Sequence, residues 1–205
     1  MEYNKEKREI KLDKVLSNLD KFVLDFVRIL KEHINYVIVS GYVSILLGRS
    51  RSTEDIDLLI PTIKKEEFEK IWKKIHENGF ECMNTSNHVE AFEMLKEHAI
   101  RFFKKGIPTP NIEYKTIKTD LDKYSYENRI KVILNNKELF ISPIELQIAY
   151  KLFLASDKID EELQPDKDIE DARHLYKMFK EKINKEEFLI FINKLNVKKR
   201  LILLE

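Results

Sequence analysis

The chain has 205 residues, 43% of them hydrophobic, which is enough for one large domain or two small subdomains with a real core. Its 37 Lys and Arg residues nearly balance 36 Asp and Glu residues, and a formal charge of +1 excludes a whole-surface attraction to nucleic acid. Cys82 is the only cysteine, which excludes an intramolecular disulfide framework, and no apolar stretch reaches membrane-spanning length. We therefore expect a cytoplasmic protein without membrane contact.

The first part of the chain alternates predicted helices and strands. Apolar residues recur at helical spacing through residues 12–32, which predicts a helix packed on a sheet. Residues 36–39 form a β-branched run and predict a buried strand. The turn Ser40-Gly41 follows, and residues 42–47 predict a short helix that ends at Gly48. Residues 55–60 predict a second strand, and residues 64–78 predict a helix that ends at Gly79.

Later segments predict more strands and then only helices. Short strands are expected at residues 80–83, 100–103 and 111–117, and a hairpin at residues 130–134 and 139–141. Ser142 as N-cap, Pro143 at the first helical position and Glu145 in a capping box predict a helix to about Ala155. After a polar loop through Asp166, helices are expected over residues 167–180 and after residue 184.

The predicted fold class is therefore α+β, with a change of character near residue 142. Residues 1–141 would form a mixed β-sheet core with flanking helices, including the N-terminal helix. Residues 142–205 would form a helical C-terminal subdomain.

Asp55 and Asp57 form the motif with the clearest chemistry. In a β-strand, residues i and i+2 share a face and lie about 7 Å apart. Two carboxylates on one face repel each other, so a neutralising partner is expected. Mg²⁺ prefers oxygen ligands of this kind, and paired metal ions are common in phosphoryl transfer. The motif therefore indicates a metal site.

The turn upstream of this motif predicts an anion site. A helix that follows a glycine-containing turn presents free N–H groups and the positive end of its dipole. We expect ordinary backbone angles at Ser40, and we expect Gly41 to need a positive φ or a close backbone approach. Arg49 and Arg51, in the loop after the short helix, could reach a bound triphosphate.

The stretch from Ser40-Gly41 to Asp55-Ile56-Asp57 resembles the signature of the DNA polymerase β-like nucleotidyltransferase superfamily, a Gly-Gly or Gly-Ser turn followed by Asp-x-Asp. It looks most like the small prokaryotic branch, which includes toxins of abortive-infection toxin–antitoxin systems. The resemblance implies Mg²⁺-dependent transfer of a nucleoside monophosphate from an NTP, with two Mg²⁺ ions, to a hydroxyl of RNA, a protein or a small molecule.

The resemblance also implies roles for particular residues. Asp55 and Asp57 would be catalytic metal ligands with a third carboxylate from a later strand, for which Glu113 is the best candidate and Asp120 the fallback. The residues that would bind the NTP are Ser40, Gly41, Arg49, Arg51 and Lys151.

A weaker match lies in the helical part. Lys151, with Lys167-Asp168 and Asp171 downstream, resembles a helical motif of the same branch. Carboxylates in the first turn of a helix are also stabilised by the helix dipole, which is a sufficient explanation for both aspartates.

Two departures from the pattern support an alternative function. Ser40 stands where glycine is usual, and Glu113 stands where aspartate is more frequent. They favour a catalytically degenerate protein that binds a nucleotide or an antitoxin-like partner. Asp55 and Asp57 are intact and favour the enzyme.

Overall fold

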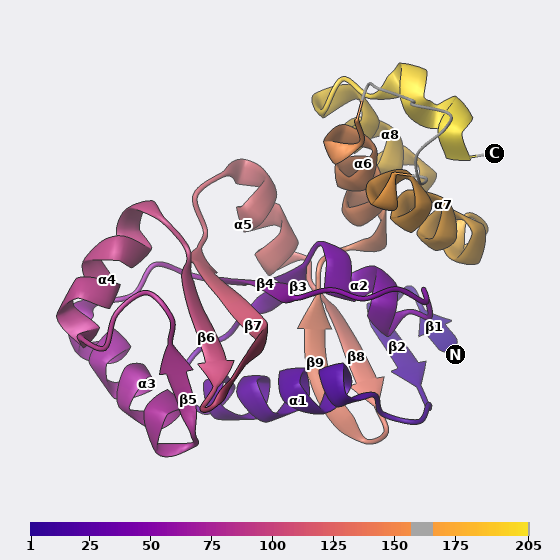
Figure 1. Ribbon diagram of the computed structural model, residues 1–205. Helices are drawn as coiled ribbons and strands as arrows, with labels where there is room; N and C mark the ends of the chain where they lie inside the picture. The colour runs from indigo at the N-terminus through magenta and orange to yellow at the C-terminus, as the bar shows by residue number, and fades with distance from the viewer. Residues whose placement is uncertain (157–165, 205) are drawn as a thin grey trace.

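A mixed sheet of nine strands forms the centre of the structure, a computed structural model that describes residues 1–156 and 166–204 (Figure 1). The strand order is β1-β2-β8-β9-β3-β4-β7-β6-β5. The pairs β2–β8, β3–β9 and β4–β7 are parallel, and the other neighbours are antiparallel. The strands are β1 (Glu2–Asn4), β2 (Glu9–Leu12), β3 (Val37–Val39), β4 (Asp55–Ile60), β5 (Phe80–Cys82), β6 (Ile100–Lys104), β7 (Ile107–Thr116), β8 (Ile130–Leu134) and β9 (Lys137–Ile141).

Helices cover the sheet and form a group of their own at the C-terminal end. Helix α1 runs along the sheet, α3 and α4 lie at its β5–β6 end, and α6 to α8 with the 3₁₀ helix η1 gather beyond α2 (Figure 1). The helices are α1 (Asn18–Leu30), α2 (Gly41–Leu46), α3 (Lys65–Glu77), α4 (His88–Glu97), α5 (Asp120–Glu127), α6 (Ile144–Leu154), α7 (Lys167–Phe179), α8 (Lys185–Lys194) and η1 (Lys198–Leu204).

Aromatic side chains join α1 and α3 to the sheet. The ring of Phe26 on α1 lies 5.1 Å from that of Phe80 and 5.7 Å from that of Phe102, measured between centroids. Trp72 on α3 contacts Phe102 at 5.7 Å. Buried aromatic side chains contribute large apolar areas, so this cluster stabilises the packing of β5 and β6 against α1 and α3.

Most of the predicted elements are confirmed. The structure contains β3, the turn, α2, β4 and α3 in the predicted order, and Gly48 follows α2 with a φ of 106°. The hairpin β8–β9 turns at Asn135 and Asn136, which both have positive φ. Helix α7 also lies where it was predicted, and Asn184 caps α8. The α+β class is confirmed.

The predicted start of the N-terminal helix was wrong. Helix α1 begins at Asn18, not near residue 12, because Leu12 belongs to β2. Strand β2 is four residues long and pairs in parallel with β8, more than a hundred residues downstream. A strand of this length has too few residues to show a periodic pattern, and its stability comes from a partner that is distant in the sequence.

The prediction of a capping box at the start of α6 was also wrong. Pro143 is the N-cap, and the Ser142 Oγ lies 3.1 Å from the Ser125 Oγ instead of capping the helix. The Oε1 atom of Glu145 accepts a hydrogen bond from the Asn184 N–H at 2.7 Å. Both side chains are therefore used for tertiary contacts.

Some segments that were expected to be loops contain regular structure. Helices α4 and α5 occupy segments for which no helix was predicted, and β7 begins at Ile107 rather than at residue 111. The polar loop predicted before Asp166 lies almost entirely outside the described residues.

Candidate active site

The turn between β3 and α2 places the strained backbone at Ser40. This residue has φ 64° and ψ −136°, whereas Gly41 is not among the glycines with positive φ. The positive φ that was considered for Gly41 is therefore found at Ser40, where ordinary backbone angles were expected. A Cβ at Gly41 would lie 2.5 Å from the Arg51 Nη2, so a larger residue there would move the end of the arginine side chain away from the turn. Arg51 thus covers the turn from the loop that follows α2.

Asp55 and Asp57 lie on one face at the start of β4. Ile56 and Leu58, which alternate with them, are fully buried, whereas Asp55 is exposed and Asp57 is half-buried. Asn111 Nδ2 donates to Asp55 Oδ1 at 2.7 Å. The two carboxylates therefore face the same side of the sheet, as the spacing predicted.

The parallel pairing of β4 with β7 brings Glu113 to Asp57. These two residues are register partners, so their side chains are neighbours on the same face. Lys115 Nζ lies 2.6 Å from Asp57 Oδ1 and 2.6 Å from Glu113 Oε2. Arg101 on β6 donates through Nη2 to Glu113 Oε1. Each oxygen of Glu113 therefore has a cationic partner.

The sequence interpretation missed Lys115 and Arg101. Lys115 follows Glu113 by two residues, and that spacing alone would have placed it on the same face of β7. Arg101 has no comparable signal, because it reaches Glu113 through the antiparallel pairing of β6 with β7.

The pKa values reflect one lysine shared between two carboxylates. Burial raises the pKa of Asp57, and the Lys115 ammonium opposes the rise while the Glu113 carboxylate adds to it. Burial also acts to raise the pKa of Glu113, but the hydrogen bonds and charges of Lys115 and Arg101 lower it on balance. Burial acts to lower the pKa of Lys115, and the two carboxylates raise it on balance. Lys115 therefore stays charged at neutral pH.

The fallback carboxylate does not join this group. Asp120 begins α5, its side chain is 90% exposed, and its ion-pair partner is Lys194 at 3.9 Å. Within residues 1–156 and 166–204, no three His, Cys, Asp or Glu side chains are arranged to hold a metal ion together. Asp55 and Asp57 suit a hard cation as carboxylates on one face, but Glu113 is engaged by two cationic side chains.

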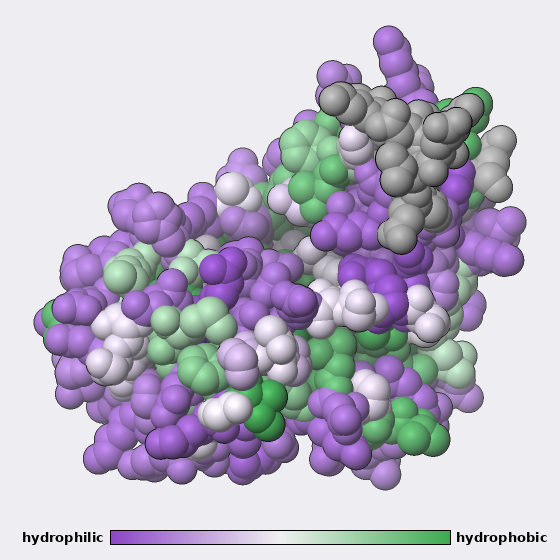
Figure 2. Space-filling model, viewed as in Figure 1, coloured by the Kyte–Doolittle hydropathy of each residue, from purple (hydrophilic) through white to green (hydrophobic). Residues whose placement is uncertain are grey.

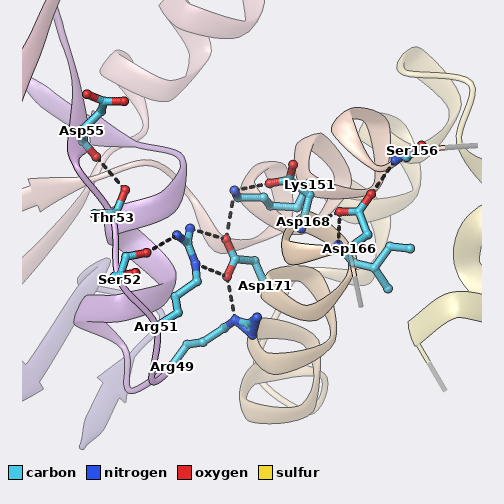
Figure 3. Close-up of polar contacts among 11 residues, drawn as sticks. Arg49, Arg51, Ser52, Thr53, Asp55, Lys151, Ser156, Asp166, Asp168 and Asp171 are labelled. Atoms are coloured by element: carbon cyan, nitrogen blue, oxygen red, sulfur yellow. Dashed lines mark hydrogen bonds and ion pairs between the residues drawn. The ribbon is translucent and has the colours of Figure 1, made fainter. Parts of the chain in front are cut away.

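A second charged cluster surrounds Asp171 on α7 (Figure 3). This carboxylate is fully buried and accepts from Arg49 Nε at 2.8 Å and from Arg51 Nη2 at 2.8 Å. Lys151 Nζ on α6 lies 2.9 Å from Asp171 Oδ2 and 2.5 Å from Asp168 Oδ1. Both arginines and Lys151 thus converge on one carboxylate, which joins the loop after α2 to α6 and α7.

The two aspartates at the start of α7 differ in position: Asp168 lies in the first turn and also pairs with Lys151, whereas Asp171 lies beyond that turn. Asp166 is the N-cap of α7, and its side chain accepts from the N–H groups of Asp168 and Ile169. Lys167 is exposed. Stabilisation at the N-terminus of the helix therefore fits Asp166 as the N-cap and Asp168 in the first turn, but it does not account for Asp171.

A cleft of about 670 Å³ lies beside the carboxylates, between the sheet and the C-terminal helices. Ser40, Asp57 and Lys115 line one wall, and the partly exposed Tyr150 and Phe153 of α6 line the other. Figure 2 shows the surface hollowed between these two parts, with apolar side chains on the helical side. A cleft with polar groups on one wall and apolar groups on the other is typical of a site for a small organic ligand.

Comparison with known proteins supports the fold. No protein-family model matches the chain, and no curated protein sequence matches it. An antigenic nucleotidyltransferase-like protein from Paracoccidioides brasiliensis has a similar structure, with a TM-score of 0.56 and 17% identity over 92% of each chain. The solution structure of the antibiotic-resistance factor ANT(2'')-Ia gives a TM-score of 0.56 at 14% identity, covering 91% of this chain and 96% of that one.

A crystal structure of ANT(2'')-Ia in complex with adenylyl-2''-tobramycin is similar too. Its TM-score is 0.55 at 13% identity, over 86% of this chain and 96% of that one. The chain therefore has the nucleotidyltransferase fold.

Proposed function

We propose that the protein is a nucleotidyltransferase, which moves a nucleoside monophosphate from an NTP to an acceptor hydroxyl with the help of Mg²⁺. The observation that supports this most is that Asp57, beside Asp55 and Glu113, lines the same cleft as the Ser40 turn. The NTP would lie in this cleft, between a core of residues 1–141 and the helical residues 142–205. The small prokaryotic branch of the superfamily and a cytoplasmic location are part of the proposal.

The phosphates would meet the turn at Ser40-Gly41. The guanidinium of Arg51 lies over Gly41, where it donates to Asp171 and to the Ser52 carbonyl, so a phosphate bound at the turn would share or replace one of these contacts. Arg49 and Lys151 hold Asp171, and Lys151 is only 2% exposed, so their contribution to NTP binding would be to fix the position of Arg51 and of the loop.

Asp55 and Asp57 would hold Mg²⁺. When bound, the cation neutralises phosphate charge and makes the acceptor hydroxyl more acidic. The side chains of the cleft orient the nucleotide and exclude water, which matters because phosphoryl transfer depends on positioning and on charge neutralisation. The acceptor would be a hydroxyl of RNA, a protein or a small molecule.

A catalytically degenerate protein that binds a nucleotide or an antitoxin-like partner is the second candidate. The observation that favours it is the pair of cations, Lys115 and Arg101, on the carboxylate expected to complete the site. Ser40 in place of glycine points the same way. Label transfer from NTP to any acceptor would exclude this candidate.

Titration calorimetry with each NTP and Mg²⁺ tests the enzyme hypothesis. We expect metal-dependent NTP binding by the unaltered chain and its loss in the double variant Asp55→Asn/Asp57→Asn. Asp25→Asn/Glu32→Gln removes two exposed charges from the region of α1 and is the matched control. Incubation with labelled NTP and total RNA or protein then identifies the acceptor. Unchanged NTP binding in the Asp55/Asp57 double variant would show that the site has been assigned wrongly.

A further inference from the structure

We infer that Lys115, supported by Arg101, takes the place of a second metal ion, because its ammonium supplies positive charge where that ion would bind. The site then takes one divalent cation with the NTP instead of two. This inference rests on the proposed function and concerns how that site is neutralised. It replaces the expectation of two Mg²⁺ ions.

The contacts of Glu113 are the first step in the argument. Its Oε2 atom lies 2.6 Å from Lys115 Nζ, and its Oε1 atom accepts from Arg101 Nη2. Lys115 also lies 2.6 Å from Asp57 Oδ1, so the ammonium bridges the two carboxylates that would share a second metal ion. A metal ion between Asp57 and Glu113 would have to displace this ammonium.

The charges lead to the same conclusion. When Asp55, Asp57 and Glu113 are all ionised, they carry three negative charges, and Lys115 and Arg101 return two positive ones. A second divalent cation would lie next to an ammonium group and would be repelled by it. With Lys115 in place, one divalent cation leaves the protein part of the site with a single positive charge, which suits a bound polyphosphate.

Asp55 and Asp57 differ from Glu113 in the partners of their carboxylate oxygens. Asp55 Oδ1 accepts from the neutral amide of Asn111, and Asp57 Oδ1 contacts Lys115. Neither aspartate is held by two cationic side chains as Glu113 is, and Asp55, which is exposed at the start of β4, has only a neutral partner among these contacts, so a single cation would be held by Asp55 with Asp57. Carboxylate oxygens of this kind are the usual protein ligands of Mg²⁺.

Lys115 is also placed to act on a ligand. Its side chain is 35% exposed and lines the cleft that contains Ser40 and Asp57. An ammonium in this position can contact a phosphate oxygen while it remains between Asp57 and Glu113, because it has three N–H donors. This arrangement distinguishes Lys115 from an ion pair that only stabilises the sheet.

Mn²⁺ binding measures the number of cations once the Mn²⁺ that the nucleotide binds in the absence of the chain is subtracted. The free Mn²⁺ signal in electron paramagnetic resonance is followed during titration of the full chain, with ATP in which a methylene group joins the α- and β-phosphorus atoms. We expect one bound Mn²⁺ per chain and nucleotide in the unaltered protein. We expect a second Mn²⁺ in Lys115→Met, because removal of the ammonium opens the space between Asp57 and Glu113.

A matched control exists on the same sheet. Lys131 pairs with Glu9 at 2.6 Å, and the exposed fractions of this pair, 35% and 14%, equal those of Lys115 and Glu113. Lys131→Met should therefore leave the stoichiometry at one. Circular dichroism checks that each variant folds, and Lys115→Gln, which keeps a polar side chain, replaces Lys115→Met if that variant does not fold.

The outcomes separate this inference from the function on which it rests. Two Mn²⁺ ions bound to the unaltered chain would overturn the inference and leave the nucleotidyltransferase proposal intact. One Mn²⁺ both in the unaltered chain and in folded Lys115 variants would also overturn it, since Lys115 would then not be what excludes the second ion. Absence of any nucleotide-dependent Mn²⁺ binding would overturn both. A gain of one ion in the Lys115 variants alone supports the inference.

Discussion

Ser40 combines an unusual backbone conformation with a position in the cleft proposed for the NTP. Its φ of 64° lies in the region that glycine adopts readily and that a side chain makes costly. The conformation turns the chain from β3 into α2 at the edge of the cleft that Ser40 lines. The cost is met by the burial of the strand and helix on either side, since Ile38 and Tyr42 are fully buried.

Replacement of Ser40 by glycine should therefore stabilise the protein. Relief of the backbone strain is worth about 1–3 kcal/mol, and the greater freedom of glycine in the unfolded chain offsets up to about 1 kcal/mol of it. We expect Ser40→Gly to raise the free energy of unfolding by about 1 kcal/mol in urea denaturation. Ser50→Gly, at an exposed loop residue without positive φ, is the control and should lower it slightly. A destabilised Ser40→Gly variant would mean that the serine hydroxyl makes a contact that outweighs the strain.

At the scale of elements, one buried carboxylate joins the start of α1 to α2. Asp20 Oδ2 accepts from the Ser17 N–H at 2.9 Å within a capping box, and Asp20 Oδ1 accepts from the Tyr42 hydroxyl at 2.9 Å. Lys14 Nζ lies 3.1 Å from the same Oδ1 atom. Burial acts to raise the pKa of Asp20, but the hydrogen bonds from Ser17 and the charge of Lys14 lower it on balance.

This lowered pKa predicts an acid-dependent contribution to stability. Because the folded state favours the ionised carboxylate, the contribution is complete above the unfolded pKa of about 3.9 and is lost as the pH falls through the folded value. We expect Asp20→Asn to lower the free energy of unfolding at pH 7 by about 2 kcal/mol and to reduce the loss of stability below pH of about 4. Thermal unfolding of both chains from pH 7 to pH 2 measures this. Parallel curves for the two chains would show that Asp20 does not titrate as the structure implies.

For the whole molecule, the Asp171 cluster is one of the contacts that join the C-terminal helices to the first part of the chain. Arg49 and Arg51 come from the loop that leads to Asp55, and Lys151 and Asp171 come from α6 and α7. Asp171 is fully buried, so its charge is acceptable only because all three cations reach it. The same contacts fix the loop that carries Arg51 over Gly41 and form one side of the region where the NTP would bind.

Loss of Asp171 should thus be costly. Asp171→Asn leaves Arg49, Arg51 and the buried Lys151 without their shared counter-charge, and breaking a buried ion pair in this way costs about 3–5 kcal/mol. Glu170→Gln on the same helix breaks a partly exposed pair with Arg173 and should change stability by less than about 0.5 kcal/mol. Urea denaturation of the two variants compares them. Equal effects would indicate that the cluster contributes nothing beyond an ordinary surface ion pair.

Much of the fold follows from local patterns in the sequence. Elements with a strong periodic signal and clear ends, such as β4, α3 and the β8–β9 hairpin, lie where they were predicted, because their apolar residues and turn residues act over a few neighbouring positions. Strand β2 was missed because its pairing partner β8 is distant in the sequence, whereas helix α5 was missed although Thr119 and Asp122 form a local capping box at its start. Ser142 and Glu145 have the residue types of a capping box, and tertiary contacts took both side chains away from it.

The candidate site divides in the same way. The sequence by itself determined that Asp55 and Asp57 share a face, since the alternation of a strand depends only on spacing. Only the tertiary structure decided that β7 pairs with β4 in the register that sets Glu113 beside Asp57, and that Arg101 approaches from β6. It also decided that Arg49, Arg51 and Lys151 meet at Asp171. Charges distant in the sequence are brought together by the packing of strands and helices, and no local pattern records which partners they will find.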